Sequence, residues 1–354
     1  MKSGDSDVFE GLRVLVTGGT GSLGKTVVRR LLAGVSGRPL RVTVFSRDEA
    51  KQHDMRLSYL HRESATDEVI YRHSQELLAF RIGDVRDYAA LARAVAEADV
   101  VVHAAALKQV PSCEYFPGEA VQTNVIGAMN LVRAIRELRL PVKVVAGIST
   151  DKACKPINVM GMTKAVMERI LVEANVESAG TRFVCVRYGN VIASRGSVVP
   201  LFLDQIANGG PVTITLREMT RFLLSLDRAV DTVFAAIEHA LPGETYVPRV
   251  PAARVVDVAD ALINGRDIRV VYTGIRPGEK IHEIMVSEEE CHRTVERGGY
   301  YVICPMLPEL QQQPIDRPAR TDEYSSSEIT LDRNALEALL APYLAAEGAA
   351  GPAR

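Results

Sequence analysis

The sequence predicts an α/β fold, in which a doubly wound parallel sheet carries helices on both faces and is followed by a smaller lobe. In the first 190 residues, short apolar runs alternate with helical patterns, as successive strand-helix-strand units require. These runs are nearly continuous in Val, Ile, Leu and Ala, which indicates strands buried on both faces. With 354 residues, 47 % of them hydrophobic, the chain can form one large or two closely joined domains.

Six apolar runs are predicted as the strands of the large sheet. They span residues 12–17, 41–46, 78–82, 100–104, 142–148 and 183–188. The first is followed by a glycine-rich turn and a helix that ends near Leu32. After the sixth strand the pattern loosens into a loop (189–200), a helix (201–208), a short strand (212–215) and another helix (227–240).

These patterns predict three regions along the chain. A sheet domain covers residues 10–190, with a return segment near 222–245, and a smaller lobe covers 191–305. Residues 306–354 are predicted as a C-terminal extension and tail. Within it, 306–323 is rich in Pro, Gln and charge and lacks periodicity, and 345–354 is an Ala/Gly/Pro-rich, frayed end.

Charge and composition exclude several classes of protein. The 42 basic and 44 acidic residues give a formal charge of −2, so no positive field is available to bind nucleic acid. No apolar stretch approaches the roughly 20 residues of a membrane span, and no signal peptide is recognisable, so a cytoplasmic protein is expected. The five cysteines are scattered and show no metal-ligand spacing, which predicts structural thiols and no metal site.

The turn after the first strand has the composition of a dinucleotide-binding loop. Three glycines at this spacing let the backbone turn tightly and approach a pyrophosphate, which then faces the N-terminus of the following helix. With five further strands behind it, the loop predicts a Rossmann-like cofactor domain. The residues expected at the cofactor are Gly18, Thr20, Gly21, Ser22, Leu23 and Gly24.

The end of the second strand favours NADP over NAD. An NAD enzyme usually has an acidic residue here for the ribose 2′-hydroxyl, whereas this chain has Ser46 and Arg47, which suit a 2′-phosphate. Lys51 is a second candidate cation, and the alternative is that Asp48 binds the ribose and the cofactor is NAD. Further cofactor contacts are expected from Asp84, Val85, Ala104, Ala105, Ala106, Lys164, Tyr188 and Asn190.

A second set of polar residues follows the fifth strand. Ser149-Thr150-Asp151-Lys152 is followed eight residues later by Met160 and then by Lys164 on a predicted helix. These are the positions of the Ser/Thr and Tyr-x-x-x-Lys elements of the short-chain dehydrogenases, and the chain resembles the extended branch of that superfamily. Met160 stands where the family's catalytic tyrosine is expected.

Further motifs narrow the resemblance. The chain is similar to the UDP-N-acetylglucosamine 4,6-dehydratases, including the 5-inverting and capsule-type enzymes, over nearly all of residues 10–300. Some capsule-type members similarly carry Met in place of the tyrosine. The matching segments are 46–49, 83–87, 103–108, 149–152, 187–191, 195–200, 219–222 and 276–280.

The resemblance implies a nucleotide-sugar dehydratase. A hydride leaves C4 of the sugar for NADP⁺, water is lost across C5 and C6, and the hydride returns to C6. Lys152 is expected to be the base at C5, which needs a lowered pKa, and Asp151 the acid that protonates the leaving 6-hydroxyl. Thr150 is expected at the C4 hydroxyl and Lys164 at the nicotinamide ribose, with Met160 as an inert wall. Lys152, Asp151 and water remain alternative acceptors of the C4 hydroxyl proton.

The resemblance also places the UDP-sugar in the smaller lobe. Arginine side chains suit a diphosphate, and a carboxylate suits a sugar hydroxyl. The expected substrate-binding residues are Lys108, Asn190, Val191, Arg195, Ser197, Val198, Arg221, Arg276 and Glu279.

Two other functions remain open at this stage. The first is a nucleotide-sugar epimerase on the same fold, which returns the hydride to the opposite face of C4 without losing water. The Asp151-Lys152 pair argues against the epimerase. A dehydratase that also epimerises C5 or C3 is a variant of the expected dehydratase. The second alternative is an idle NADP-binding module, and the retention of Asp151, Lys152 and Lys164 argues against it. The resemblance further implies a homo-oligomer, a dimer or a hexamer. The segment 306–324 is either a surface loop or an arm that reaches a neighbouring subunit.

Overall fold

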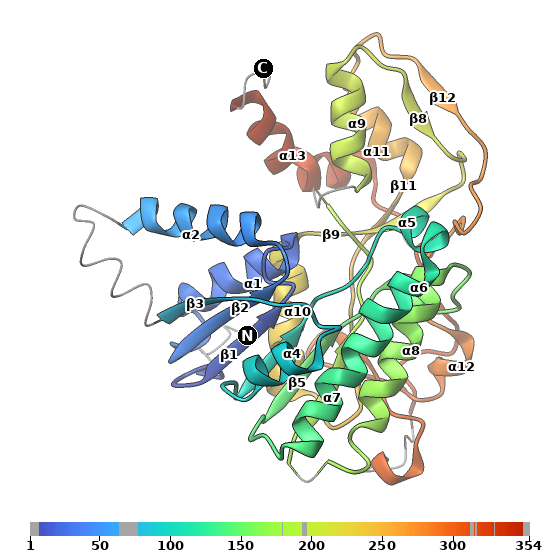
Figure 1. The fold of residues 1–354 in the computed structure, drawn as a ribbon. Helices are drawn as coiled ribbons and strands as arrows, with labels where there is room; N and C mark the ends of the chain where they lie inside the picture. The colour runs from blue at the N-terminus through green and yellow to red at the C-terminus, as the bar shows by residue number, and fades with distance from the viewer. Residues whose placement is uncertain are drawn as a thin grey trace.

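The computed structural model describes residues 7–63, 77–178, 180–192, 197–311, 315, 317–328 and 330–349. Within them, a nine-stranded sheet has the order β14-β15-β10-β6-β5-β4-β1-β2-β3 (Figure 1). The predicted α/β class is confirmed. The seven strands from β3 to β10 are parallel, and β15 and β14 are added antiparallel at one edge.

The six predicted strands are all present, with ends that shift by at most two residues. They are β1 Arg13–Thr17, β2 Arg41–Ser46, β3 Leu78–Ile82, β4 Val100–His103, β5 Val144–Ile148 and β6 Arg182–Val186. The three remaining strands of the sheet are β10 Thr245–Pro248, β14 Thr294–Arg297 and β15 Tyr300–Ile303. The sequence analysis assigned residues 294–303 to the smaller lobe, whereas in the structure they extend the large sheet.

The sheet has a separate apolar core on each face. Successive side chains of a strand point to opposite faces, so Val14 and Val16 pack on one side and Leu15 on the other. The first side is covered by α1 Ser22–Leu32, α2 Glu49–Glu63 and α10 Leu226–His239. The second is covered by α4 Tyr88–Val95, α7 Gly127–Glu137 and α8 Val159–Glu173. This two-sided burial explains the nearly continuous apolar runs.

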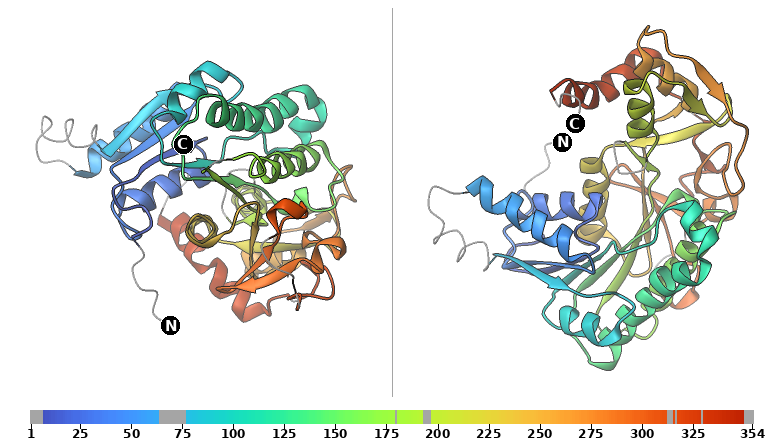
Figure 2. Two further views of the ribbon diagram at one scale, coloured as in Figure 1. Left: turned by 90° about the horizontal axis from the view of Figure 1, so that it is seen from below. Right: turned by 45° about the horizontal axis from the view of Figure 1, so that its top comes forward.

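The smaller lobe has its own core. Its elements are α9 Val198–Ala207, β8 Val212–Ile214, α11 Val255–Ile263, β12 Val270–Tyr272 and a three-stranded sheet of β7 Asn190–Val191, β9 Thr220–Leu224 and β11 Ala252–Arg254. The C-terminal helix α13 Arg333–Ala349, red in Figure 2, packs on α11 and buries Leu336 and Leu340 in this core. The expected frayed end therefore begins no earlier than the end of α13.

The remaining helical elements of the described residues are short. They are α5 Val110–Tyr115, α6 Pro117–Ala120, the π-helix η1 Val121–Ile126, the 3₁₀ turn η2 Asp151–Ala153, α12 Glu288–Cys291 and the 3₁₀ turn η3 Pro308–Leu310. In addition, β13 Ile284–Val286 pairs antiparallel with β16 Tyr324–Ser325. Residues 324–325 of the predicted C-terminal extension therefore pair with an earlier strand of the same chain. Among the described helices, none combines the length and the apolar character that crossing a membrane demands.

Candidate active site

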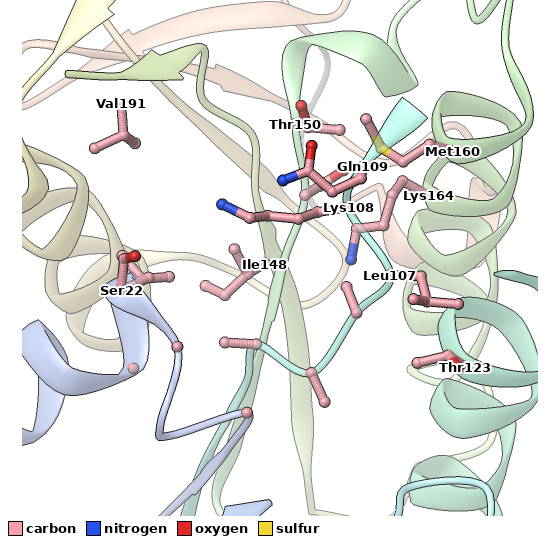
Figure 3. Close-up of a pocket in the computed structure, with 18 of the residues that line it drawn as sticks. Ser22, Leu107, Lys108, Gln109, Thr123, Ile148, Thr150, Met160, Lys164 and Val191 are labelled. Atoms are coloured by element: carbon pink, nitrogen blue, oxygen red, sulfur yellow. The ribbon is translucent and has the colours of Figure 1, made fainter. Parts of the chain in front are cut away.

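A cavity of about 750 Å³ lies at the carboxyl ends of the central strands, where parallel α/β sheets bind their ligands. Glycine-loop residues line one side, and residues of β5, η2 and α8 line the other (Figure 3). The predicted site residues that line it are Gly18, Thr20, Gly21, Ser22, Leu23, Gly24, Ser46, Arg47, Asp48, Lys51, Asp84, Val85, Ala104, Ala105, Ala106, Lys108, Thr150, Asp151, Lys152, Met160, Lys164, Tyr188, Asn190, Val191, Ser197, Arg276 and Glu279.

Three predicted substrate residues are not among the lining residues. Arg221 is in β9, and its guanidinium donates to the carbonyl oxygens of Thr220, Ile281 and Lys280. These backbone carbonyls take hydrogen bonds from both terminal nitrogens of the Arg221 guanidinium, and binding of a diphosphate by Arg221 stays a prediction. Val198 begins α9 and packs on the core of the smaller lobe. Arg195 lies outside the described residues.

The glycine loop fits a closely approaching ligand. Gly18 has a φ of +67°, and a Cβ there would lie 2.8 Å from the Cα of Ala105. A Cβ on Gly24 would lie 2.5 Å from the Cα of Gly19, so α1 can pack this tightly only with glycine. Since α1 begins at Ser22, its free backbone N–H groups face the cavity and suit a pyrophosphate. The residues present therefore fit a dinucleotide.

At the end of β2, the charged side chains are already partly paired. Asp48 accepts a hydrogen bond from the backbone N–H of Lys51 at 3.0 Å and forms an ion pair with the Lys51 ammonium, which lowers the pKa of Asp48. Arg47 keeps 57 % of its side chain exposed and lies 3.7 Å from Asp84. Arg86 forms the closer ion pair with Asp84, at 2.7 Å. Arg47 thus remains the cation with the most exposed side chain at this end of the cavity.

The turn after β5 carries the predicted acid and base. The hydroxyl of Thr150 donates to Oδ1 of Asp151 at 2.8 Å, and Nζ of Lys152 lies 3.1 Å from the same oxygen. Asp151 is 1 % exposed, and burial raises the pKa of its carboxyl group, the direction expected for a proton donor. Among the described residues, Oδ2 of Asp151 has no hydrogen-bond partner.

The electrostatics of Lys152 differ from the expectation. A lowered pKa was predicted for this lysine, but the pKa is raised. Burial alone would lower it, and the carboxylates of Asp151 and of Glu283 outweigh that effect. Oε1 of Glu283 lies 3.1 Å from the Lys152 ammonium. No spacing rule in the sequence points to this glutamate, which is brought in by the chain entering β13.

Lys164, unlike Lys152, has a lowered pKa. It is buried on α8, and burial lowers its pKa to about 8. Its Nζ contacts the sulfur of Met167 at 2.9 Å. Figure 3 shows Lys164 and Met160 side by side on α8, both facing the cavity. Met160 is buried and provides apolar wall without a proton-accepting group.

The loop that carries Lys108 is held by a side chain from the π-helix. Asn124 accepts from the backbone N–H of Leu107 at 2.8 Å and donates to the carbonyl of the same residue at 3.0 Å. Figure 3 shows Lys108 and Gln109 reaching between Ser22 and the helix of Lys164. Besides Oδ2 of Asp151, three buried cavity-lining groups have no partner among the described residues, namely Thr123 Oγ1, Asn190 Oδ1 and Ser197 Oγ, and they are available to a polar ligand. Of these, Thr123 was missed by the sequence analysis.

No cluster of three or more His, Cys, Asp or Glu side chains suited to a metal ion occurs among the described residues.

Comparison with known proteins identifies the family. Residues 14–305 match the family model described as polysaccharide biosynthesis protein. The chain belongs to this family. The family match and the fold together identify a short-chain dehydrogenase-type enzyme that modifies nucleotide sugars. Its fold is of the NAD(P)-binding type.

Members of the polysaccharide biosynthesis family with two different activities resemble this chain. It is 43 % identical over 301 residues to a UDP-glucose 4-epimerase of Rickettsia typhi, covering 84 % of each chain. It is 40 % identical over 309 residues to an inverting UDP-N-acetylglucosamine 4,6-dehydratase of Campylobacter jejuni, covering 86 % of each. A solved structure, Pen from Bacillus thuringiensis, is 31 % identical with a TM-score of 0.83, covering 95 % of this chain and 98 % of that one.

Proposed function

We propose that this protein is an NADP-dependent UDP-N-acetylglucosamine 4,6-dehydratase that inverts C5. The observation that carries the proposal is the Asp151-Lys152 pair, with its two polar atoms 3.1 Å apart in the cavity that the glycine loop also lines. Elimination of water needs an acid and a base beside the nicotinamide, whereas C4 epimerisation needs neither at C5 and C6. The 40 % identity to the inverting dehydratase supports the same choice.

The cofactor proposed is NADP, and Arg47 and Ser46 are the residues that would hold its 2′-phosphate. When bound, NADP supplies the acceptor and donor for the hydride that leaves C4 and returns at C6. Asp48, the residue that NAD binding would use for a ribose hydroxyl, is paired with Lys51 through both the backbone N–H and the ammonium, which favours NADP. Lys164 is proposed to hold the nicotinamide ribose.

Proton transfer within the Asp151-Lys152 pair prepares both groups for elimination. Movement of one proton from the Lys152 ammonium to Oδ1 of Asp151 creates a neutral amine and a protonated acid in a single step. The amine then takes the proton from C5 of the 4-keto sugar, and Asp151 protonates O6 as the C6–O bond breaks and water leaves. After hydride addition at C6, Lys152 returns a proton to C5 from one face, which sets the inverted configuration.

The first oxidation needs an acceptor for the C4 hydroxyl proton, because Met160 cannot take it. Lys152, Asp151 and an ordered water are the candidates from the sequence. The structure adds Lys164, whose pKa of about 8 allows it to act as a base near neutral pH. Thr150 is proposed to donate to or accept from the same hydroxyl.

A second candidate function is C4 epimerisation, favoured by the 43 % identity to the Rickettsia typhi enzyme. It uses the same cofactor site and the same C4 oxidation, but the hydride returns to the other face of C4. The Asp151-Lys152 pair then has no part in breaking a C–O bond.

Incubation of the purified protein with UDP-N-acetylglucosamine in D₂O, without added oxidant, tests the proposal. Mass spectrometry and proton NMR are expected to show loss of one water and deuterium at C5. Because C4 of the keto product carries no proton to couple with, the C5 configuration is read from a parallel reaction in H₂O, by the nuclear Overhauser effects between the C5 proton and the other ring protons. Unchanged mass with a new stereocentre would identify an epimerase. Absence of any product, from this and related UDP-sugars, would support an idle cofactor-binding protein.

The matched variant for this experiment is Asp151→Asn, which keeps the side-chain shape and removes the acid. We expect product formation to fall by about 10²- to 10⁴-fold, the usual contribution of general acid-base catalysis, while NADP binding is retained. Full dehydration by Asp151→Asn would contradict the role assigned to this residue.

A further inference from the structure

Glu283 is a buried carboxylate that stands behind the catalytic lysine. Its Oε1 lies 3.1 Å from the Lys152 ammonium, and the side chain of Glu283 is 2 % exposed. Lys152 lines the cavity, whereas Glu283 does not. The ammonium is therefore held between two carboxylates, Asp151 on the cavity side and Glu283 behind it.

The backbone of Glu283 is anchored by hydrogen bonds, and Oε1 of its carboxylate faces two cations, whereas Oε2 has no hydrogen-bond partner among the described residues. Its N–H donates to Oγ of Ser326 at 3.0 Å, and its carbonyl accepts from the N–H of Ser326 at 2.8 Å. Oγ of Ser326 in turn lies 2.6 Å from the hydroxyl of Thr220. Nε of Arg221 lies 3.9 Å from the same carboxylate oxygen that faces Lys152. Ser326 therefore helps to hold the backbone that places Glu283 beside Lys152.

Burial of such a carboxylate is costly unless its charge is compensated, and an apolar residue of similar size would be the cheaper solution for stability alone. Here compensation comes from Lys152 and Arg221, with Lys280 also near. Burial alone would raise the pKa of Glu283, but these cations hold it below its usual range, so Glu283 stays ionised while Asp151 exchanges its proton.

We propose that Glu283 is a positioning residue that orients the Lys152 amine toward the substrate and serves as its permanent counter-ion, so that Asp151 is free to act as the acid. This inference rests on the proposed function, since it deepens the roles of Lys152 and Asp151. Without the carboxylate behind it, the amine can turn onto Asp151 or out into the cavity.

The sign of the expected effect follows from every charged group that faces Lys152. Asp151 and Glu283 favour its ammonium form, and Arg221 disfavours it. Lys280, on the chain leading to β13, adds a further positive charge beside this cluster. In Glu283→Gln, one of two favourable charges is removed and both cations remain. Lys152 then loses its proton at lower pH, and its free amine becomes more abundant near neutrality.

Competitive labelling of the full-length protein with acetic anhydride across a pH series measures this directly, because only the free amine reacts. Peptide mass spectrometry reports the modification of Lys152 in wild type, in Glu283→Gln and in the control Glu288→Gln, which removes an exposed carboxylate of α12. We expect Lys152 in Glu283→Gln to be labelled roughly tenfold faster near neutral pH, as for a pKa lowered by about one unit, with the control unchanged. An unchanged labelling profile in Glu283→Gln would overturn the inference.

Turnover supplies the second readout. In Glu283→Gln we expect kcat and C5 deuterium incorporation to fall at unchanged KM, and the rising limb of the rate–pH profile to move to lower pH. Glu283→Asp, which keeps the charge, is expected to recover part of the rate. Equal losses in Glu283→Asp and Glu283→Gln, with no shift of the pH profile, would indicate a structural role and contradict the inference.

A folding defect is separated by a second variant. Ser326→Ala leaves Glu283 in place but removes the oxygen that anchors its N–H, and a smaller change of the same sign is expected. No change in Lys152 labelling in this variant would contradict the assigned support. The labelling needs no substrate, so failure of the proposed dehydration would appear in wild-type turnover alone and would leave the labelling result standing.

Discussion

The proposed preference for NADP rests on single charged residues at the end of β2. Asp48 and Lys51 engage each other, and Arg47 extends its largely exposed guanidinium beside Asp84. A guanidinium donates two hydrogen bonds to one phosphate, which suits a 2′-phosphate. Neighbouring charges also decide the pKa of Lys152 in the turn after β5. Burial alone would lower this pKa, but the carboxylates of Asp151 and Glu283 raise it.

Replacement of Arg47 by Ala is expected to weaken NADP binding about 10- to 100-fold and to leave NAD binding nearly unchanged. Hydrogen bonds to a charged group contribute about 1.5–3 kcal/mol, and each 1.4 kcal/mol is tenfold in affinity. Isothermal titration calorimetry with each cofactor measures the dissociation constants of NADP and NAD and hence their ratio. Arg133→Ala on α7 is the surface control. Equal losses for both cofactors would show that Arg47 does not contact the 2′-phosphate.

At the scale of elements, a buried ion-pair network joins the strand and helices around the site. Arg187, just after β6, lies 2.7 Å from Glu168 on α8 and 2.7 Å from Glu290 on α12. Ser149, at the start of the catalytic turn, donates to the same Glu168. The network thus links β6, α8, α12 and the turn that carries Asp151. Removing one partner leaves a buried charge uncompensated, which costs about 3–5 kcal/mol.

This network predicts a loss of stability in acid. Burial alone would raise the pKa of Glu290, but Arg187 and the hydrogen bonds lower it to about 2. Because the folded pKa lies below that of the unfolded chain, the stabilisation is complete above about pH 5 and is lost as the pH falls toward 2. We expect the free energy of unfolding of wild type to fall between pH 7 and pH 3, with about 2 kcal/mol of that fall due to Glu290. Urea unfolding at pH 7, 5 and 3 measures it, and this contribution is expected to be absent in Glu290→Gln.

The exposed Glu49→Gln serves as the control for that series and is expected to unfold as wild type does at each pH. An acid-induced loss of the same size in Glu290→Gln and wild type would assign the slope to other carboxylates.

At the scale of the whole molecule, three neighbouring helical elements each carry exposed large hydrophobic residues. Val121, Met129, Met162 and Val166 are exposed large hydrophobic residues on η1, α7 and α8, and α7 and α8 pack side by side (Figure 1). Exposed apolar groups on adjacent helices are typical of association surfaces. We propose that two copies of this chain pair through these helices, the homo-oligomer that the family resemblance implies.

The double substitution Met129→Glu with Val166→Glu is expected to shift the protein from oligomer to monomer, because each copy would place two charges in a desolvated contact. Sedimentation velocity over a range of concentrations measures the shift. Val35→Glu, which charges an exposed apolar residue after α1, is the control and should leave the oligomer intact. An oligomer that survives the double substitution would place the contact elsewhere.

The sequence by itself determined the class of fold, six strands of the sheet and the position of the site. This was possible because buried parallel strands are recognisable from local composition, and because their carboxyl ends meet at one edge. Residues that directly follow strands, such as Gly18, Asp84 and Asp151, were therefore found as cavity residues without any three-dimensional information.

Only the tertiary structure decided which distant residues contact the site residues at that edge of the sheet. Glu283 and Ser326 reach the catalytic turn, Arg221 turns its guanidinium to backbone carbonyls, and α13 completes the core of the smaller lobe. None of these contacts follows a local period, because each joins segments far apart in the chain. The sign of the Lys152 pKa shift depends on such a contact, since a charge set by neighbours in space has no signature in the residues beside it in sequence.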